Sequence, residues 1–302
     1  MTIFLSKETA MTLVLFAATV LIWGTTWFAI ALQLGPVPVL TSVLYRFALA
    51  AVVMMGWLIA TGRLRRRGWA MHRWFIALGL CLFSVNFICF YNAARFIPSG
   101  LVSVIFSLAT IYNAINGRLF FREPIPARAI GAAGLGVAGL LLLFRRELFG
   151  HTLDDGALIG IGLAALGTLF FSLGNMVSRH ISSLGIGPAE ANGWGMTYGA
   201  CGLAVVVWLS GAGLHVPPSG TYVGALIYLA VVGSALGFTT YLLLVARMGS
   251  ARAAYATVAF PVVALIVSSL FEGYQWEPAG IAGLALTLAG NVLIFRRAKA
   301  AS

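Results

Sequence analysis

The sequence predicts an all-α polytopic membrane protein, with ten transmembrane helices arranged as two inverted five-helix repeats. Three observations support this fold class. The 302 residues are 61% hydrophobic and only 9% charged, whereas soluble domains carry about 25% charged residues. Apolar runs of about 20 residues, the length that crosses a bilayer as a helix, follow one another along the chain. The two halves of the chain also end in similar residue patterns, which indicates an internal repeat.

Ten apolar runs are separated by short connections that contain Gly, Pro or charged residues. They cover residues 11–31, 37–61, 72–94, 98–118, 127–146, 156–178, 189–210, 220–246, 251–271 and 279–296. Lys and Arg concentrate in alternate connections, most densely at residues 63–67, and the positive-inside rule places those connections and both termini in the cytoplasm. The net charge of +11 is therefore explained by membrane orientation, and we expect no nucleic-acid partner.

The repeat is clearest in the last spans of the two halves. Glu123 and Glu272 each lie eight residues before a glycine, and each of these segments ends in Phe-Arg-Arg. Residues 1–150 and 151–302 are therefore predicted to form two five-helix units. Because five is an odd number, the second unit must enter the membrane from the opposite side. Transporters built from such inverted repeats bind their substrates near the bilayer midplane.

Three motifs resemble the EamA-type branch of the drug/metabolite transporter superfamily. IWGTTWF (22–28) is similar to the family's Trp-Gly motif, YRFALAA (45–51) to its second-span pattern, and residues 246–273 to its ninth-span pattern. The resemblance covers nearly the whole chain. It implies an exporter of amino acids and related metabolites, aromatic amino acids among them, in the bacterial inner membrane.

One position departs from the family pattern. Tyr112 stands where the family often has proline, eleven residues before Glu123. We therefore expect a straighter helix over residues 98–118, with the Tyr112 hydroxyl reaching the cavity. In the second half Pro261 occupies the equivalent position. Proline removes a backbone hydrogen bond and bends a helix, so Pro261 is a candidate gating hinge.

Polar and aromatic side chains within the apolar runs are candidates to line a central cavity, because polar groups in hydrocarbon tend to face protein or water. A polar stripe at helical spacing over residues 99–113 favours cavity lining. For isolated Ser, Thr and Asn, helix packing at about 0.6 kcal/mol each is the alternative. The predicted substrate-binding residues are Trp27, Arg46, Asn86, Phe90, Ser103, Ser107, Tyr112, Phe171, Asn175, Tyr198, Phe238, Tyr241 and Tyr255.

Arg46 is the one charged residue predicted deep within a span. It lies about nine residues from the outer end, roughly 13 Å along a helix, close to the middle of a ~30 Å hydrocarbon core. No acidic residue is near it in the sequence, and inserting a charge at that depth costs about 2.5–3.5 kcal/mol. Two roles remain open, namely binding backbone carbonyls at broken helices or binding a substrate carboxylate.

Carboxylates are predicted at the ends of spans rather than at their centres. For Glu123 and Glu272 we favour capping or pairing with arginine over gating, since surface charges are usually solvated or paired. An efflux pump for cationic drugs would need a carboxylate within the membrane, so the sequence disfavours that function. It remains an alternative, as does a passive facilitator of neutral metabolites.

Four isolated His and three single Cys form no nucleophile–base or metal constellation. We therefore expect no catalytic residues, no metal site and no cofactor. The sequence predicts a transporter of neutral or zwitterionic metabolites, most of all amino acids, working by alternating access around a central cavity. Its predicted partners are a small-molecule substrate and the lipid bilayer, with no obligate protein partner.

Overall fold

The computed structural model describes residues 7–125, 127–145, 155–248 and 255–295. All regular elements within these ranges are helices, which confirms the all-α prediction. They are α1 (Lys7–Ala31), α2 (Val39–Ala60), α3 (Trp69–Leu80), η1 (Cys81–Val85), α4 (Asn86–Ala93), α5 (Ser99–Ser107), α6 (Ala109–Phe121), α7 (Ala127–Leu143), α9 (Asp155–Ser183), α10 (Pro188–Leu209), α11 (Gly220–Ile227), η2 (Tyr228–Leu236), α12 (Gly237–Met248), α14 (Tyr255–Phe271) and α15 (Pro278–Phe295).

Six helical segments in the described ranges are long and apolar enough to cross a membrane. They cover Met11–Ala31, Val39–Ala60, Trp69–Ala93, Ser99–Phe121, Asp155–Ser183 and Gly220–Tyr241. Three shorter apolar helices lie at Arg128–Leu143, Ala256–Phe271 and Pro278–Leu293. Long apolar runs therefore form helices where the hydropathy of the sequence predicts them.

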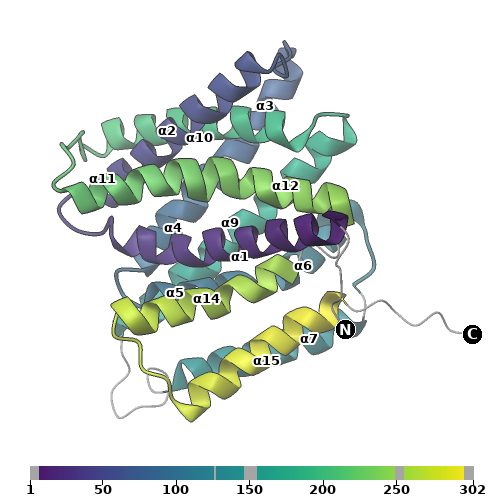
Figure 1. Cartoon of the computed structure of the whole chain (residues 1–302), viewed down its shortest axis with the longest axis vertical. Helices are drawn as coiled ribbons and strands as arrows, with labels where there is room; N and C mark the ends of the chain where they lie inside the picture. Colours follow the sequence, from purple (N-terminus) through teal and green to yellow (C-terminus); the bar gives the residue numbers. More distant parts are fainter. Residues whose placement is uncertain (1–6, 126, 146–154, 249–254, 296–302) are drawn as a thin grey trace, which may run out of the picture.

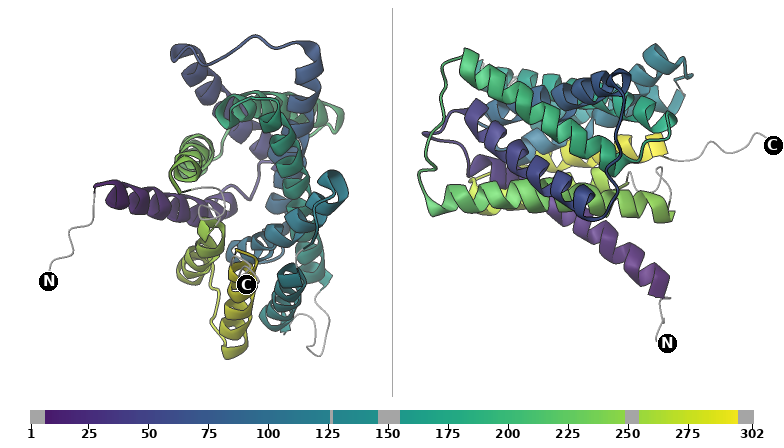
Figure 2. Two further views of the ribbon diagram at one scale, coloured as in Figure 1. Left: turned by 90° about the vertical axis from the view of Figure 1, so that its right-hand side faces the viewer. Right: turned by 90° about the horizontal axis from the view of Figure 1, so that it is seen from above.

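Helix α1 lies between α12 and α14 in the middle of the bundle (Figure 1). Helix α10 packs on α2 and α3 at one edge, and α7 pairs with α15 at the opposite edge. The N-terminal turns of α1 extend beyond the other helices (Figure 2). Because α1 also contacts α5, it meets helices from both halves of the chain.

Helices α7 and α15 approach each other closely at glycines. A Cβ on Gly139 would lie 2.6 Å from the carbonyl oxygen of Gly283, too close for any real side chain. Small residues at membrane helix interfaces let backbones come together in this way. These two helices contribute no described residue to the two internal spaces described below, and we refer to this pair as the α7–α15 scaffold.

The prediction of a straighter helix over residues 98–118 is wrong. The helix is interrupted at Leu108, between α5 and α6, where the Leu108 N–H donates to the Ile105 carbonyl three residues earlier. The Ser103 and Ser107 hydroxyls donate to the carbonyls of Gly100 and Val104. Such bonds from side chain to backbone compete with the helical pattern and bend membrane helices without proline.

Two π-helical segments were not predicted. Segment η1 separates α3 from α4, and η2 separates α11 from α12. The wide π turn frequently occurs at functional sites. Leu82 of η1 and Gly233 of η2 both line the cavity described next.

Candidate functional site

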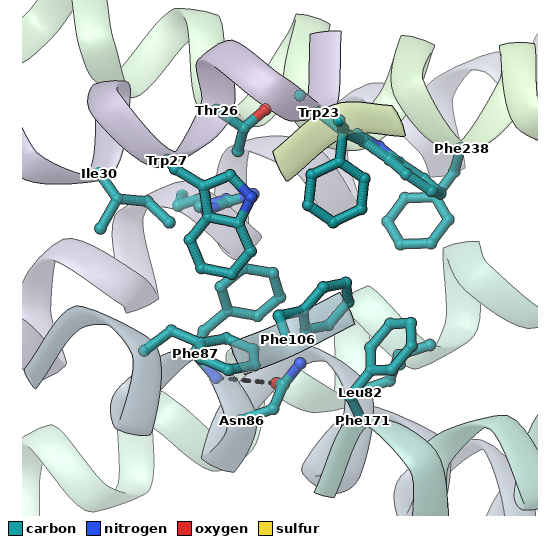
Figure 3. Close-up of a pocket in the computed structure, with 14 residues that line it drawn as sticks. Trp23, Thr26, Trp27, Ile30, Leu82, Asn86, Phe87, Phe106, Phe171 and Phe238 are labelled. Carbon is teal, nitrogen blue, oxygen red and sulfur yellow. Dashed lines mark hydrogen bonds between the residues drawn. The ribbon is translucent and has the colours of Figure 1, made fainter. Parts of the chain in front are cut away.

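An aromatic cavity lies between helices of both halves of the chain (Figure 3). The space among its lining atoms, open solvent included, is about 570 Å³, and the interior volume of the cavity itself is about 70 Å³. Helix α1 contributes Trp23, Thr26, Trp27 and Ile30. The remaining lining residues are Arg46, Leu82, Asn86, Phe87, Phe90, Phe106, Phe171, Gly233, Phe238 and Phe260.

The aromatic rings of this cavity pack against one another. The Trp27 ring centre lies 5.3 Å from that of Phe90 and 5.5 Å from that of Phe106. Phe106 in turn lies 4.5 Å from Phe171, edge to face. Such geometries are favourable for aromatic pairs, so these rings form firm walls suited to a flat apolar ligand.

Arg46 is 2% exposed and lines this cavity. Its Nε and Nη2 each donate to the Ser234 hydroxyl at 3.4 Å, and its guanidinium carbon lies 4.3 Å from the Phe87 ring centre. The Tyr91 phenol also interacts electrostatically with the guanidinium. Nη1 is buried and has no hydrogen-bond partner among the described residues. Nearby protein groups therefore leave part of this buried cation unsatisfied.

Asn86 is a second buried polar group in the lining, with no exposed surface. Its Oδ1 accepts a hydrogen bond from the backbone N–H of Phe87 at 2.8 Å, whereas its Nδ2 has no partner in the described part of the chain. The aromatic cavity thus contains two unsatisfied donors, one charged and one neutral.

A wider space, here called the vestibule, continues from the aromatic cavity. It encloses about 1490 Å³, open solvent included, and shares five lining residues with the cavity: Trp23, Leu82, Phe106, Phe171 and Phe238. Polar side chains on α6 and α9 lie along it. Ser172 donates to Asn113 Oδ1 at 2.8 Å, and Asn175 Nδ2 donates to the same oxygen at 3.3 Å.

Glu123 and Arg179 lie at the mouth of the vestibule. The two guanidinium nitrogens of Arg179 contact the two carboxylate oxygens of Glu123 at 2.9 and 2.5 Å. These hydrogen bonds hold the pKa of the Glu123 carboxyl below its usual value. Both side chains are about half exposed, so this is a solvated pair, as the sequence favoured for Glu123.

Glu272, the second of the two glutamates, connects α5 to α14. We call the hydrogen bonds that link these helices through Glu272 and Ser268 the α5–α14 contact. Glu272, just after α14, accepts hydrogen bonds from the Ser99 hydroxyl at 2.6 Å and from the Ser99 N–H at 3.3 Å. Ser268 donates to the same carboxylate and accepts from the Gly100 N–H at 2.9 Å. A carboxylate at the first N–H groups of α5 acts as a helix cap. Capping was the role favoured for Glu272 from the sequence.

The predicted binding residues divide into several groups. Those in the aromatic cavity are Trp27, Arg46, Asn86, Phe90, Phe171 and Phe238. Ser107, Asn175 and Tyr241 line the vestibule, together with Phe171 and Phe238. Ser103, Tyr112 and Tyr198 line neither space, and the side chain of Tyr255 lies outside the described part of the structure. Pro261 lies inside α14, which is assigned as one helix.

Tyr198 and Tyr112 differ from the expectation that they reach the cavity. The Tyr198 hydroxyl lies 2.8 Å from His72 Nδ1, where α10 packs on α3. Tyr112 is half-buried on α6. The predicted set also omitted Trp23, Phe106 and Phe260. Trp23 could have been found because it lies four residues before Trp27, on the same helical face.

A model of the EamA-like transporter family matches residues 10–145 and, a second time, residues 158–296. The chain belongs to this family. The resemblance of its motifs to the EamA-type branch is therefore confirmed.

Several curated relatives match most of the chain. A protein of Salmonella typhimurium, named a probable amino-acid metabolite efflux pump, is 24% identical over 73% of this chain and 77% of its own length. The uncharacterized inner membrane transporter YedA of Escherichia coli is 25% identical over 90% of this chain and 88% of its own. A probable terminal-alkyne amino-acid exporter of Streptantibioticus cattleyicolor is 24% identical over 67% of this chain and 65% of its own.

A protein of known crystal structure shares the fold. It superposes with a TM-score of 0.66 at 18% identity, over 94% of this chain and 96% of its own. Together with the family and the apolar helices, the inner-membrane relatives indicate a multi-pass inner-membrane transporter rather than an enzyme.

Proposed function

We propose that this member of the EamA-like family exports small metabolites that carry a carboxylate, with amino acids and related compounds among them. The observation that carries this proposal is Arg46, a buried cation with an unsatisfied Nη1 in an aromatic cavity. Arginine matches a carboxylate in geometry and charge, and a charge buried within the membrane is a candidate functional residue by default. Two relatives named for amino-acid efflux or export support the same class of substrate.

The aromatic walls favour substrates with an aromatic or apolar body. Trp27 and Phe106 contact each other, with ring centres 5.5 Å apart, and both present aromatic surface to the cavity in which the guanidinium of Arg46 lies. Aromatic amino acids therefore belong to the proposed range.

The topology proposed for this function has ten membrane crossings. They are the six long apolar segments, the three shorter apolar helices and α10. Residues 1–150 and 151–302 form the two inverted repeats in this proposal, which the double match to the family model supports. The boundary itself lies outside the described residues. Both termini are placed in the cytoplasm by the positive-inside rule.

In this topology the structure faces inward. The mouth of the vestibule, at Glu123 and Arg179, lies on the cytoplasmic side, and the α5–α14 contact lies on the outer side. Alternating access then requires the α5–α14 contact to open while the cytoplasmic mouth closes.

An exporter of cationic drugs is the alternative, and the lining residues argue against it. No carboxylate lines the aromatic cavity within the described residues, and Glu123 in the vestibule is already held by both Arg179 nitrogens. A passive facilitator differs from the proposed exporter only in coupling, so a flux measurement is needed to separate the two.

Flux in proteoliposomes tests the proposal. We expect labelled amino acids, aromatic ones included, to exchange across the membrane while a cationic dye does not. Arg46→Ala should abolish exchange, and Arg63→Ala should not, because Arg63 stacks on Trp57 at the end of α2. Exchange of the dye alone, or full amino-acid exchange by a folded Arg46→Ala protein, would contradict the proposal.

A further inference from the structure

We propose that the aromatic cavity selects organic monoanions over zwitterions. The preferred ligand has an apolar aromatic body, a carboxylate and a second hydrogen-bond acceptor beside it, as in 2-hydroxy and 2-oxo acids. The inference rests on the proposed function and narrows its substrate class.

The first argument is charge. Arg46 gives the cavity one positive charge, and the described lining contains no acidic residue. A bound monoanion neutralises this charge, whereas a zwitterion brings a second cation into the same low-dielectric space, where an uncompensated charge is costly.

The described lining of the cavity offers few side-chain acceptors and no compensating negative charge to an ammonium group. Such a group carries three donors, whereas Thr26 supplies the one side-chain hydroxyl in the lining that could accept from it. Aromatic faces can attract cations. The Phe87 face lies 4.3 Å from the Arg46 guanidinium carbon, and an ammonium on any of the seven other lining rings would share this enclosed space with the same guanidinium. The vestibule acid Glu123 is paired with Arg179.

The second argument is the fixed orientation of Asn86. A backbone N–H can only donate, so the bond from Phe87 requires the amide oxygen of Asn86 to face it. The amide nitrogen is consequently turned away from this bond, toward the aromatic rings (Figure 3). It is fully buried and has no partner within the described residues.

The ligand features follow from these two donors. Arg46 Nη1 and Asn86 Nδ2 both need acceptors, because leaving a buried donor unsatisfied is unfavourable. A carboxylate satisfies the first, and a hydroxyl or keto oxygen on the adjacent carbon can satisfy the second. The ammonium of an amino acid occupies that same position but is itself a donor, so it cannot pair with the Asn86 amide nitrogen.

Four ligands on one indole scaffold separate these features. Indole-3-lactate has the carboxylate and the second acceptor, indole-3-propionate has the carboxylate only, tryptophan adds the ammonium, and tryptamine has the ammonium alone. Calorimetric titration of the purified full-length protein at pH 7.4 should give the tightest binding for indole-3-lactate. We expect tryptophan to bind about tenfold more weakly, from one unfavourable donor–donor contact, and tryptamine not to bind.

Variants assign the effect to the two residues. Asn86→Leu should remove the roughly two- to tenfold preference for indole-3-lactate over indole-3-propionate expected from one neutral hydrogen bond. Asn92→Leu is the matched control on the same helix, since Asn92 bonds the Ile88 carbonyl and lines neither internal space. It should keep the preference. Arg46→Gln should weaken both anions about tenfold or more.

The outcomes that overturn the inference differ from those that overturn the proposed function. Tryptophan binding as tightly as indole-3-lactate, in an Arg46-dependent manner, overturns the selectivity and leaves carboxylate export standing. Binding of none of the four ligands also overturns it, while amino-acid flux in proteoliposomes then decides the proposed function separately. Tight binding of tryptamine would contradict both.

Discussion

Gly100 is the position where a single methyl group should change the conformational equilibrium. A Cβ at Gly100 would lie 2.8 Å from Ser268 Oγ, 2.9 Å from the Ala264 carbonyl oxygen and 3.0 Å from Leu265 Cα. Ordinary contacts begin at 3.4 Å, so Gly100→Ala must move α5 away from α14. The Gly100–Ser268 hydrogen bond within the α5–α14 contact would lengthen with it.

The magnitude follows from overpacking, which costs about 1–3 kcal/mol. This penalty applies only while α5 and α14 touch, because the added methyl group has no such neighbours once the contact opens. The gain in intrinsic helix propensity from Gly to Ala affects both conformations alike and cancels. A difference of about 1–3 kcal/mol between two conformations shifts their ratio about 5- to 150-fold, here away from the proposed inward-open state.

Thiol accessibility measures this shift. The three native cysteines Cys81, Cys89 and Cys201 are first replaced, and Ser178 in the vestibule is then changed to cysteine. The labelling rate with a membrane-impermeant maleimide, added from the cytoplasmic side of inside-out vesicles, reports how often the vestibule is open. We expect Gly100→Ala to lower this rate at least about fivefold.

Gly139→Ala is the matched control. Its Cβ would lie 2.6 Å from the Gly283 carbonyl and closer still to the Thr287 hydroxyl, so it is overpacked at least as strongly, but in the α7–α15 scaffold. It should lower stability without changing the labelling rate. An unchanged rate in a folded Gly100→Ala protein, or an equal fall in Gly139→Ala, would refute the assignment of the α5–α14 contact as the outer closure.

Three further results are expected. Arg46→Lys should fold but lose about tenfold or more of its transport rate, since an ammonium cannot bind a carboxylate in bidentate fashion; undiminished flux would count against Arg46 as the carboxylate site. Because Arg179 lowers the pKa of Glu123, the pair stabilises the folded state at pH values above the ordinary pKa of a glutamate carboxyl. This stabilisation is lost as the pH falls through the lower pKa that Glu123 has in the folded state. Glu123→Gln should therefore change stability by only about 0–1 kcal/mol at pH 7 for this half-exposed pair, and by less still in acid, as followed by thermal unfolding in detergent. Ser172→Ala removes the acceptor of the buried Asn116 amide at 2.9 Å, and unfolding titrations should show a loss of about 0.6–1.7 kcal/mol.

Hydropathy was sufficient to place the helices but not the interruptions within them. Apolar length and turn residues define where a membrane helix begins and ends. The break at Leu108 occurs instead where the Ser103 and Ser107 hydroxyls donate to backbone carbonyls of their own helix. Serine in a membrane helix can equally donate to a neighbouring helix, so its presence in the sequence does not predict a break. The residue types in the π turns of η1 and η2 do not distinguish these segments from ordinary α-helix.

The residues that line the cavity could be predicted only in part, because contacts between helices are not visible in the sequence. Helical spacing determines which residues share a face, but not whether that face meets a cavity or another helix. Trp27 and Phe90 meet across the aromatic cavity, whereas Tyr198 lies against His72 on α3. The depth of Arg46 could be inferred from distance along the span, whereas its partner Ser234, in η2 of the second half, required the tertiary structure.

The two glutamates that the proposed repeat makes equivalent have different partners in this structure. Glu272 caps α5 and joins it to α14, while Glu123 binds an arginine on α9 at the open mouth of the vestibule. A symmetric arrangement would close both ends or open both, and neither would allow alternating access. Inverted repeats avoid this when each unit adopts the conformation that the other has left. The different partners of Glu123 and Glu272 are therefore what we expect of one state in a two-state cycle, with Arg46 in a cavity that each end exposes in turn.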